Sequence, residues 1–167
     1  MAPMPISDLL GARRTWIDQT SEIAASSGAV MAALTDIDAW ASWIPGLVGV
    51  TRSAGPLSVG SRFSMLVKPA AFHPPLKVPC KVYKMTPTLI EWGGDLLGSV
   101  VRHSFELTPL DSGATRVRQL EYATGILALL ARIAEPGIYK HNLRWQEALR
   151  DRLERTQRGA TFSETHA

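Results

Sequence analysis

The sequence offers one pair of side chains, His103 and Glu121, whose types and positions would suit proton transfer. The segment VVRHSFEL, residues 100–107, alternates as a β-strand does, which places His103 on one face with Phe105 and Leu107. An apolar face of this kind is turned to the interior. An imidazole and a carboxylate in an apolar chamber have shifted pKa values, and together they can act as general acid and base.

Glu121 belongs to the next strand-like segment, TRVRQLEYA, residues 115–123. Arg116 and Arg118 fit the outer face, which favours Gln119 and Glu121 on the inner face. Leu120 and Tyr122 have the parity of the arginines, and as apolar residues they compete for the inner face. With a connecting loop over 109–113, cross-strand pairing puts His103 opposite Gln119 and diagonal to Glu121. Three interpretations stay open: the polar groups satisfy one another in a core, recognise a ligand, or catalyse a reaction.

The remaining reactive residue types give weaker indications. His141 lies in the C-terminal helical region and could face the mouth of an internal space, whereas His73 stands among prolines in a loop. The histidines are scattered and lack carboxylates at ligand spacing, so the sequence predicts no metal site, and no phosphate-binding loop points to a cofactor. Cys80 is the single cysteine, which excludes an internal disulfide and indicates a small buried residue.

The charge pattern argues against a nucleic-acid partner. The net charge is +3, and residues 139–158 hold six cations and three anions, which is the whole excess. Opposite charges at helical spacing indicate the solvated face of one helix, and no aromatic residues are interleaved for base stacking. No apolar run approaches the roughly 20 residues that span a bilayer. We therefore expect a cytoplasmic protein without a transmembrane segment, as a monomer or homodimer.

The candidate residues need a scaffold, and hydrophobic periodicity with turn residues predicts one. Strands are predicted at 16–23, 47–52, 61–68, 76–84, 89–92, 100–108 and 114–123, and helices at 27 to about 36, 38–43 and 126 to about 156. Ser26 or Ser27 can cap the first helix, and Pro45 ends the second. Pro136-Gly137 should kink or break the long helix.

This order of elements predicts an α+β fold. A curved antiparallel sheet of about seven strands, with two short helices after the first strand, has one face to cover, and only the long C-terminal helix can cover it. Ile138, Trp145, Leu149 and Leu153 fall on one side of that helix. A single helix is too narrow to fill the concave face of a wide sheet, so we expect an internal cavity.

Trp40 and Trp43, three residues apart, stand on one face of the short helical turn before Pro45. They either fill a core or help to close one end of an apolar chamber. Strand alternation directs further side chains to the same interior, including Val78 and Cys80. The residues predicted to line a ligand are Trp40, Trp43, Phe63, Met65, Val82, Trp92, His103, Phe105, Gln119, Glu121, His141 and Trp145.

Three segments in order resemble one known superfamily. EIAASSGAVMAALTDIDAWASWIPGL, LIEWGGDLLGSVVRHSFELTPLDSGATRVRQLEYATG and WQEALRDRLE are similar to the START-like polyketide cyclase/dehydrase and lipid-transport proteins, also called Bet v 1-like or SRPBCC. The resemblance spans residues 16–156 and implies a helix-grip fold, but the superfamily has no universal catalytic residues to carry over. The linker PAAFHPPLKVP and Pro136-Gly137 depart from the pattern.

The leading functional hypothesis is a helix-grip domain that encloses a hydrophobic or amphipathic small molecule, such as a lipid or polyketide, between sheet and helix. An alternative is an enzyme of cyclase, aromatase or dehydratase type that uses His103 and Glu121 in the same cavity. A third is an interaction protein with a collapsed cavity. We expect an N-terminal extension over 1–15, one domain over 16–156 and a polar tail over 157–167.

Overall fold

Seven antiparallel strands form one sheet in the order β1-β7-β6-β5-β4-β3-β2. The computed structural model describes residues 13–68, 74–96 and 98–164, without the side chains of 96, 129–138 and 157–164. The strands are β1 (Arg14–Ile23), β2 (Leu47–Arg52), β3 (Arg62–Val67), β4 (Leu76–Thr86), β5 (Leu89–Leu96), β6 (Ser99–Pro109) and β7 (Thr115–Ala123). The helices are α2 (Ser27–Thr35), the 3₁₀ helix η1 (Ile37–Ser42) and α3 (Ile126–Glu164). The predicted α+β, helix-grip fold is confirmed.

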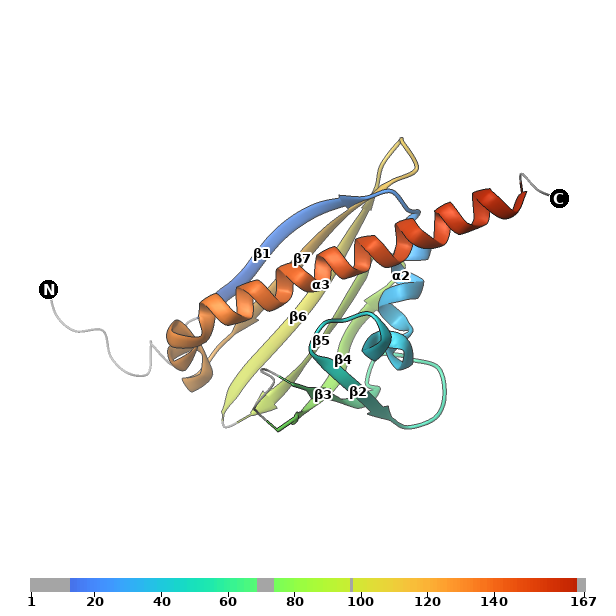
Figure 1. The fold of residues 1–167 in the computed structure, drawn as a ribbon. Helices are drawn as coiled ribbons and strands as arrows, with labels where there is room; N and C mark the ends of the chain where they lie inside the picture. The colour runs from blue at the N-terminus through green and yellow to red at the C-terminus, as the bar shows by residue number, and fades with distance from the viewer. Residues whose placement is uncertain (1–12, 69–73, 97, 165–167) are drawn as a thin grey trace, which may run out of the picture.

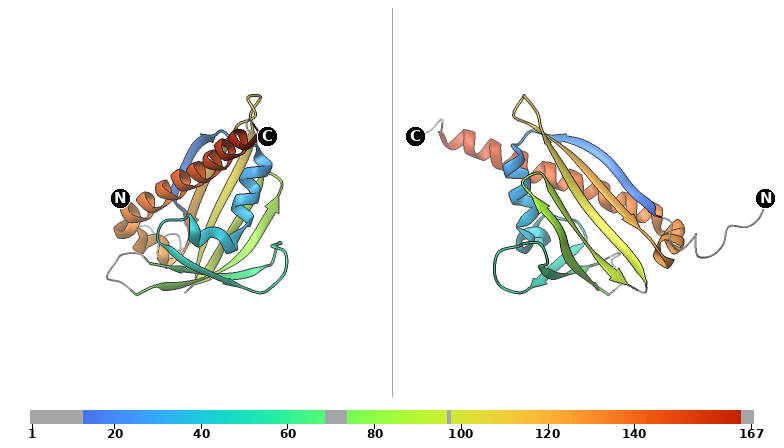
Figure 2. Two further views of the ribbon diagram at one scale, coloured as in Figure 1. Left: turned by 45° about the vertical axis from the view of Figure 1, so that its right-hand side comes forward. Right: turned by 180° about the vertical axis from the view of Figure 1, so that it is seen from behind.

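The long helix α3 lies along the concave face of the curved sheet, as Figures 1 and 2 show. It packs chiefly against β1 and also contacts β6 and β7. The short helices lie beside it, because α2 contacts both α3 and β6, and η1 packs on β2. Among the helices of the described residues, none is long and apolar enough to cross a membrane.

Local sequence sets the start of α2, and contact with the sheet sets the start of α3. Ser26 caps α2, where its hydroxyl oxygen accepts the Ala29 N–H at 3.3 Å. The first turn of α3 is capped from β6, because the Leu127 N–H donates to the Ser99 hydroxyl at 3.0 Å. Gly125 precedes α3 with a φ of 74°, in the left-handed region that favours glycine.

α3 is longer and more continuous than predicted. It ends at Glu164 rather than near Thr156, and it is helical across Pro136-Gly137, so the break considered there is wrong. Its first turns lie at an angle to the rest of the helix in Figure 1. A proline costs a helix interior roughly 3 kcal/mol. Burial of Leu149 and Leu153 stabilises the folded state by about 1.5–3 kcal/mol each, so packing on the sheet can hold the helix together.

The core lies between the concave face of the sheet and α3. Trp145, Leu149 and Leu153 are buried as predicted, and the side chain of Ile138 lies outside the described part of the chain. The strands contribute alternate residues, as the sequence predicts. Their buried inner-face side chains include Ile17, Ile23, Phe63, Cys80, Val82, Ile90, Trp92, Phe105, Leu107 and Val117.

The tightest steric constraint on the sheet is at Gly93 in β5. A Cβ added to Gly93 would lie 1.9 Å from the carbonyl oxygen of Val101 in β6, and that oxygen belongs to the backbone. Any side chain at this position would therefore push the two strands apart. Gly28 in α2 provides the opposite case, because no heavy atom lies within 4 Å of a Cβ added there.

We expect Gly93→Ala to lower the free energy of unfolding by about 2 kcal/mol or more, because overpacking against a fixed backbone cannot relax cheaply. Gly28→Ala should raise it by about 0.5–1 kcal/mol, since alanine favours the helix. Urea unfolding of the two variants and the wild type measures both effects. Equal stability of the Gly93→Ala variant and the wild type would contradict the close approach of β5 and β6.

Candidate polar site on the concave face

A side-chain network joins β1, β6 and β7 to α3 in the interior, and Gln119 of β7 is its centre. The Gln119 Nε2 atom donates to Asn142 Oδ1 of α3 at 2.6 Å and lies 2.8 Å from His103 Nε2 of β6. The Gln119 Oε1 atom accepts from Gln19 Nε2 of β1 at 2.7 Å. Gln119 is fully buried, and these contacts satisfy its amide.

The network fixes the protonation of His103. The Gln119 amide nitrogen carries two protons, of which one goes to Asn142, so the other is directed at His103 Nε2. That ring nitrogen must accept, which leaves the proton on Nδ1 and the imidazole neutral. Burial, with a smaller effect of His141, lowers the pKa of His103 to about 3. Geometry and electrostatics therefore agree on a neutral histidine.

Glu121 is the acidic member of the network. Its Oε2 atom accepts from Asn142 Nδ2 at 2.7 Å, which is the only polar contact of this carboxyl group within the described residues. Burial raises the pKa of Glu121 to about 7, and the Asn142 hydrogen bond lowers it by a smaller amount. The carboxyl group is thus poised to change its charge near neutral pH.

The predicted register between β6 and β7 is wrong by two residues along β7. His103 lies opposite Glu121, and Phe105 lies opposite Gln119. The cause is the connection, because Pro109 pairs with Thr115 and the loop covers 110–114 rather than 109–113. Each strand keeps its inner face, so the predicted side chains still meet. His103 contacts Gln119 along the diagonal, and among the described contacts it has no hydrogen bond to Glu121.

Aromatic rings occupy the space beside His103. The ring centroid of His103 lies 4.8 Å from that of Trp92, 5.0 Å from Trp145 and 5.1 Å from Phe105. Trp40 reaches the same cluster, with its centroid 5.4 Å from Trp145. The described side chains therefore pack this part of the interior with aromatic contacts, and an enclosed cavity here stays a prediction.

The concave face of the sheet has an open end at the start of β4. Leu76 and Val78 share the inner-face parity of Cys80 and Val82 in β4, yet they are 56% and 37% exposed. The prediction that Val78 points inward fits the register, which pairs it with Met65 of β3. Its exposure shows that the apolar inner surface meets solvent here.

His141 of α3 lies near this open end. A Cβ added to Gly46, in the turn before β2, would be 3.7 Å from the His141 Cε1 atom. The backbone also joins this turn to the end of β3, because the Lys68 N–H donates to the Gly46 carbonyl oxygen. Partial burial, with the nearby charge of Arg144, lowers the pKa of His141. His141 therefore lies near the exposed end of the inner surface, and its contact with a ligand stays a prediction.

The two tryptophans around η1 have different surroundings. Trp40 is fully buried, with its ring 5.8 Å from Phe63 in an edge-on contact, so it fills the core. Trp43 is partly buried against that core, and the Arg152 guanidinium of α3 lies 5.8 Å from its ring centroid. Trp40 therefore fits the core-filling alternative, whereas Trp43 lies between η1 and α3.

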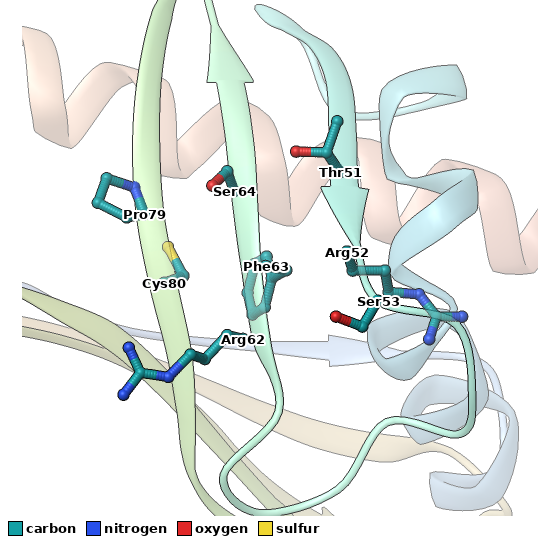
Figure 3. A pocket seen from close by; sticks show the side chains of 8 residues that line it. All are labelled: Thr51, Arg52, Ser53, Arg62, Phe63, Ser64, Pro79 and Cys80. Atoms are coloured by element: carbon teal, nitrogen blue, oxygen red, sulfur yellow. The ribbon is translucent and has the colours of Figure 1, made fainter.

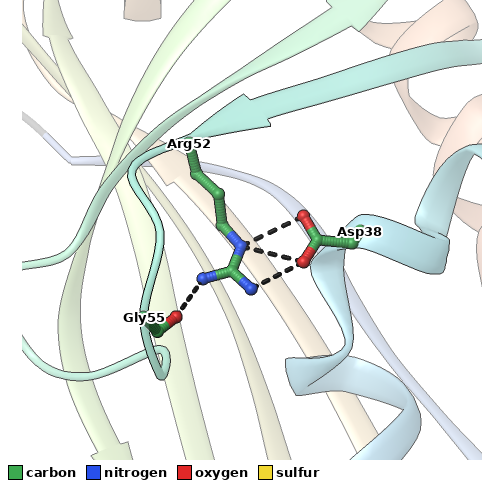
Figure 4. A network of polar contacts seen from close by, with 3 residues as sticks. All are labelled: Asp38, Arg52 and Gly55. Carbon is green, nitrogen blue, oxygen red and sulfur yellow. Dashed lines mark hydrogen bonds and ion pairs between the residues drawn. The ribbon is translucent and has the colours of Figure 1, made fainter.

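An ion pair ties η1 to the sheet. The Arg52 guanidinium of β2 donates to both carboxylate oxygens of Asp38, with its Nη2 atom 2.6 Å from Oδ2, and it also donates to the Gly55 carbonyl oxygen (Figure 4). Arg52 lowers the pKa of Asp38 below its ordinary value. This contact fixes the helical turn that carries Trp40.

A separate depression of about 450 Å³ lies over β2, β3 and β4 (Figure 3). Its lining residues are Thr51, Arg52, Ser53, Arg62, Phe63, Ser64, Pro79 and Cys80. None of these belongs to the polar network around Gln119. Burial raises the pKa of the Cys80 thiol to about 12, so this sulfur is not a nucleophile at neutral pH.

The structure brings four of the predicted polar residues to the inner surface but adds two that sequence reasoning missed. Gln19 and Asn142 complete the network. A signal existed for each, because Gln19 shares the inner face of β1 with Ile17, and Asn142 stands one turn before Trp145. His73 lies outside the described residues. Within the described ranges, no three His, Cys, Asp or Glu side chains gather as a metal site would require.

Comparison with known proteins identifies the family of the chain and solved structures with a similar fold. The family model for polyketide cyclase/dehydrase and lipid transport matches residues 14–158. Among curated sequences, none gives a significant match. The Zhui aromatase/cyclase from Streptomyces sp. R1128 has a TM-score of 0.73 and 15% identity, over 89% of this chain and 98% of that one.

Two further solved structures have the same fold. A START superfamily protein from Mycobacterium smegmatis has a TM-score of 0.67 and 18% identity, over 84% of this chain and 97% of that one. Norcoclaurine synthase from Thalictrum flavum, in complex with dopamine and hydroxybenzaldehyde, has a TM-score of 0.64 and 18% identity, over 90% of this chain and 92% of that one. Identities this low establish likeness of fold alone.

The opposite pKa shifts of Glu121 and His103 predict opposite pH effects on stability. Folding raises the pKa of Glu121 from 4.5 to about 7, so this residue lowers stability as the pH rises through that window. Folding lowers the pKa of His103 from 6.5 to about 3, so stability is lost as the pH falls through that window.

Relative to the wild type, Glu121→Gln should therefore gain stability as the pH rises from 4.5 to 7, by something on the order of 1–3 kcal/mol. His103→Gln should gain relative stability as the pH falls below 6.5. Urea midpoints measured from pH 4 to pH 8 give both difference curves. Parallel curves for the two variants would show that these groups titrate normally in the folded state.

Proposed function

The chain belongs to the polyketide cyclase/dehydrase and lipid transport family of the START-like (SRPBCC) superfamily, and we propose that it binds a hydrophobic or amphipathic small molecule between the sheet and α3. The observation that carries this proposal is the open end of the concave face. Leu76 and Val78 point to the inner side of the sheet but stay exposed. Apolar area costs about 25 cal/mol per Å² while it faces water, and a ligand would cover it.

The polar network would orient such a molecule. Glu121 lies opposite His103, and the second carboxyl oxygen of Glu121 and the Nδ1 of His103 have no hydrogen-bond partner within the described residues. A few polar groups beside apolar walls are the usual means by which a pocket fixes the pose of its ligand. The aromatic rings around His103 supply those walls, so a ligand that enters from the open end would displace or slide along them.

An enzyme of cyclase, aromatase or dehydratase type is the second candidate. The observation that favours it is the pairing of Glu121, whose pKa is raised to about 7, with a neutral His103 directly across the strands. A carboxyl group that can give or take a proton near neutral pH suits acid–base chemistry on a carbonyl substrate. The two candidate functions use the same site. They differ in whether the protein converts the bound molecule chemically before releasing it.

The proposal extends to the domain boundaries, location, oligomeric state and partners of the chain. We propose a single domain over 16–156, a cytoplasmic location, and a monomer or homodimer without a nucleic-acid partner. We propose that ligand contact comes from Trp40, Trp43, Phe63, Met65, Val82, Trp92, His103, Phe105, Gln119, Glu121, His141 and Trp145. The polar groups among them would bind the ligand without a metal or other cofactor.

For binding, we expect an organic extract of the purified protein to release a small molecule that mass spectrometry detects. The emptied protein should bind the neutral fluorescent probe N-phenyl-1-naphthylamine. Val78→Asp should weaken probe binding about tenfold or more, because a charge would stand at the apolar entrance. Val59→Asp is the matched control, since Val59 is 59% exposed in the loop at the other end of β2 and β3. A clean extract together with no probe binding would instead favour an interaction protein.

For catalysis, the test needs the molecule that the extract identifies, offered as a substrate. His103→Ala and Glu121→Gln should each reduce turnover by about 100-fold or more, the scale of general acid–base catalysis, and leave substrate affinity within a few-fold. Glu106→Gln, on the opposite face of β6, serves as the control with unchanged turnover. Full turnover by both inner-face variants would remove the enzyme hypothesis and leave binding intact.

A further inference from the structure

We propose that the molecule bound on the concave face carries a cationic amine. Its ammonium group would pair with the carboxylate of Glu121, and its apolar body would lie against the aromatic residues around His103. This inference rests on the proposed small-molecule binding and names the chemical class of the ligand. It begins with the carboxyl group of Glu121, which forms no ion pair with any described residue.

The carboxyl group of Glu121 has one polar partner within the described residues, the Asn142 amide at 2.7 Å. A neutral amide donates one hydrogen bond but does not neutralise a charge. The group faces the interior side of β7 and is partly buried. A desolvated carboxylate without a cation is costly, and the raised pKa of Glu121 expresses that cost. A ligand that brings its own positive charge would remove it.

No described residue on the strands beside Glu121 forms an ion pair with its carboxyl group. On β6, the residue directly opposite is His103, whose Nε2 accepts a hydrogen bond and whose ring is neutral. On β1, the residue directly opposite is Ile17. Arg14 of β1 lies opposite Ala123, on the same inner face as Glu121, and among the described residues no ion pair joins the two side chains.

The described part of α3 supplies none either. Asn142 faces Glu121, and the preceding His141 has its pKa lowered by burial and by Arg144, so it is mainly neutral at pH 7. The Arg144 side chain itself is exposed. The arginines of β7 lie on the outer face, where Arg116 pairs with Glu22. Apart from Arg14, the cations described near this site thus lie on other faces or lose their charge.

A site of this kind selects ligands by charge. An ammonium gains an ion pair in a partly desolvated setting, where Coulomb attraction is several times stronger than in water. The faces of Trp92 and Trp145 also attract cations. A hydroxyl gains only a hydrogen bond, and a ligand carboxylate would stand beside a like charge. The expected order of affinity is amine, then alcohol, then acid.

Three probes with one ring system test this order by isothermal titration calorimetry: naphthylethylamine, naphthylethanol and naphthylacetate. At pH 8 we expect the amine to bind the wild-type protein at least about tenfold more tightly than the alcohol, and the acid most weakly. The advantage of the amine should shrink toward pH 5.5, because Glu121 takes up a proton as the pH falls through about 7. Binding of the alcohol should change little.

Glu121→Gln should abolish the preference for the amine and keep the alcohol bound, because a glutamine oxygen can still accept the Asn142 hydrogen bond. Glu106→Gln is the matched control, since Glu106 lies on the outer face of β6 and pairs there with Arg118. Equal affinity for amine and alcohol, or a preference that survives Glu121→Gln, would overturn this inference while small-molecule binding stands. Failure of all three probes to bind would overturn the binding proposal, and this inference with it.

Discussion

One buried amide holds the sheet to the helix that covers it. Gln119 contacts β1 through Gln19, β6 through His103 and α3 through Asn142. The bonds to His103 and Asn142 are buried and the bond to Gln19 is partly buried. The loss of a buried partner would leave a buried polar atom unsatisfied, at a cost of about 1–3 kcal/mol. The need to satisfy this amide therefore fixes the helix in both rotation and depth over the sheet.

The same network determines the electrostatics of the interior. Because Gln119 donates to His103, the imidazole accepts and stays neutral, and it offers no positive charge to Glu121 across the strands. Asn142 holds the carboxyl group in place without balancing it. Aromatic rings pack beside His103, and Leu76 exposes another part of the inner surface to solvent. The proposed binding, acid–base chemistry and charge selection all depend on this carboxyl group.

The sequence predicts correctly which face of the sheet the side chains of β6 and β7 occupy, but it does not predict which residues pair across these strands. Alternation in β6 and β7 is set by burial, so His103 and Glu121 were placed inside correctly. Register depends on where the loop begins. The loop begins and ends one residue later than predicted, so each residue of β6 pairs with a β7 residue two positions further along, on the same face. Pro136-Gly137 does not interrupt α3, since local propensity yields to packing on the sheet. Asn142 was missed because a lone polar residue in an apolar stripe shows no partner until the fold supplies one.

Within the described residues, the carboxyl group of Glu121 lies on the inner face of the sheet without an ion pair. Carbon-13 NMR of protein labelled at the glutamate carboxyl carbons, titrated from pH 4 to pH 9 with Glu121→Gln to assign the signal, tests it most directly. A midpoint for Glu121 near pH 7 is the expected result. A midpoint at or below 4.5 would mean that water or an unrecognised cation stabilises the charge, and it would contradict the account.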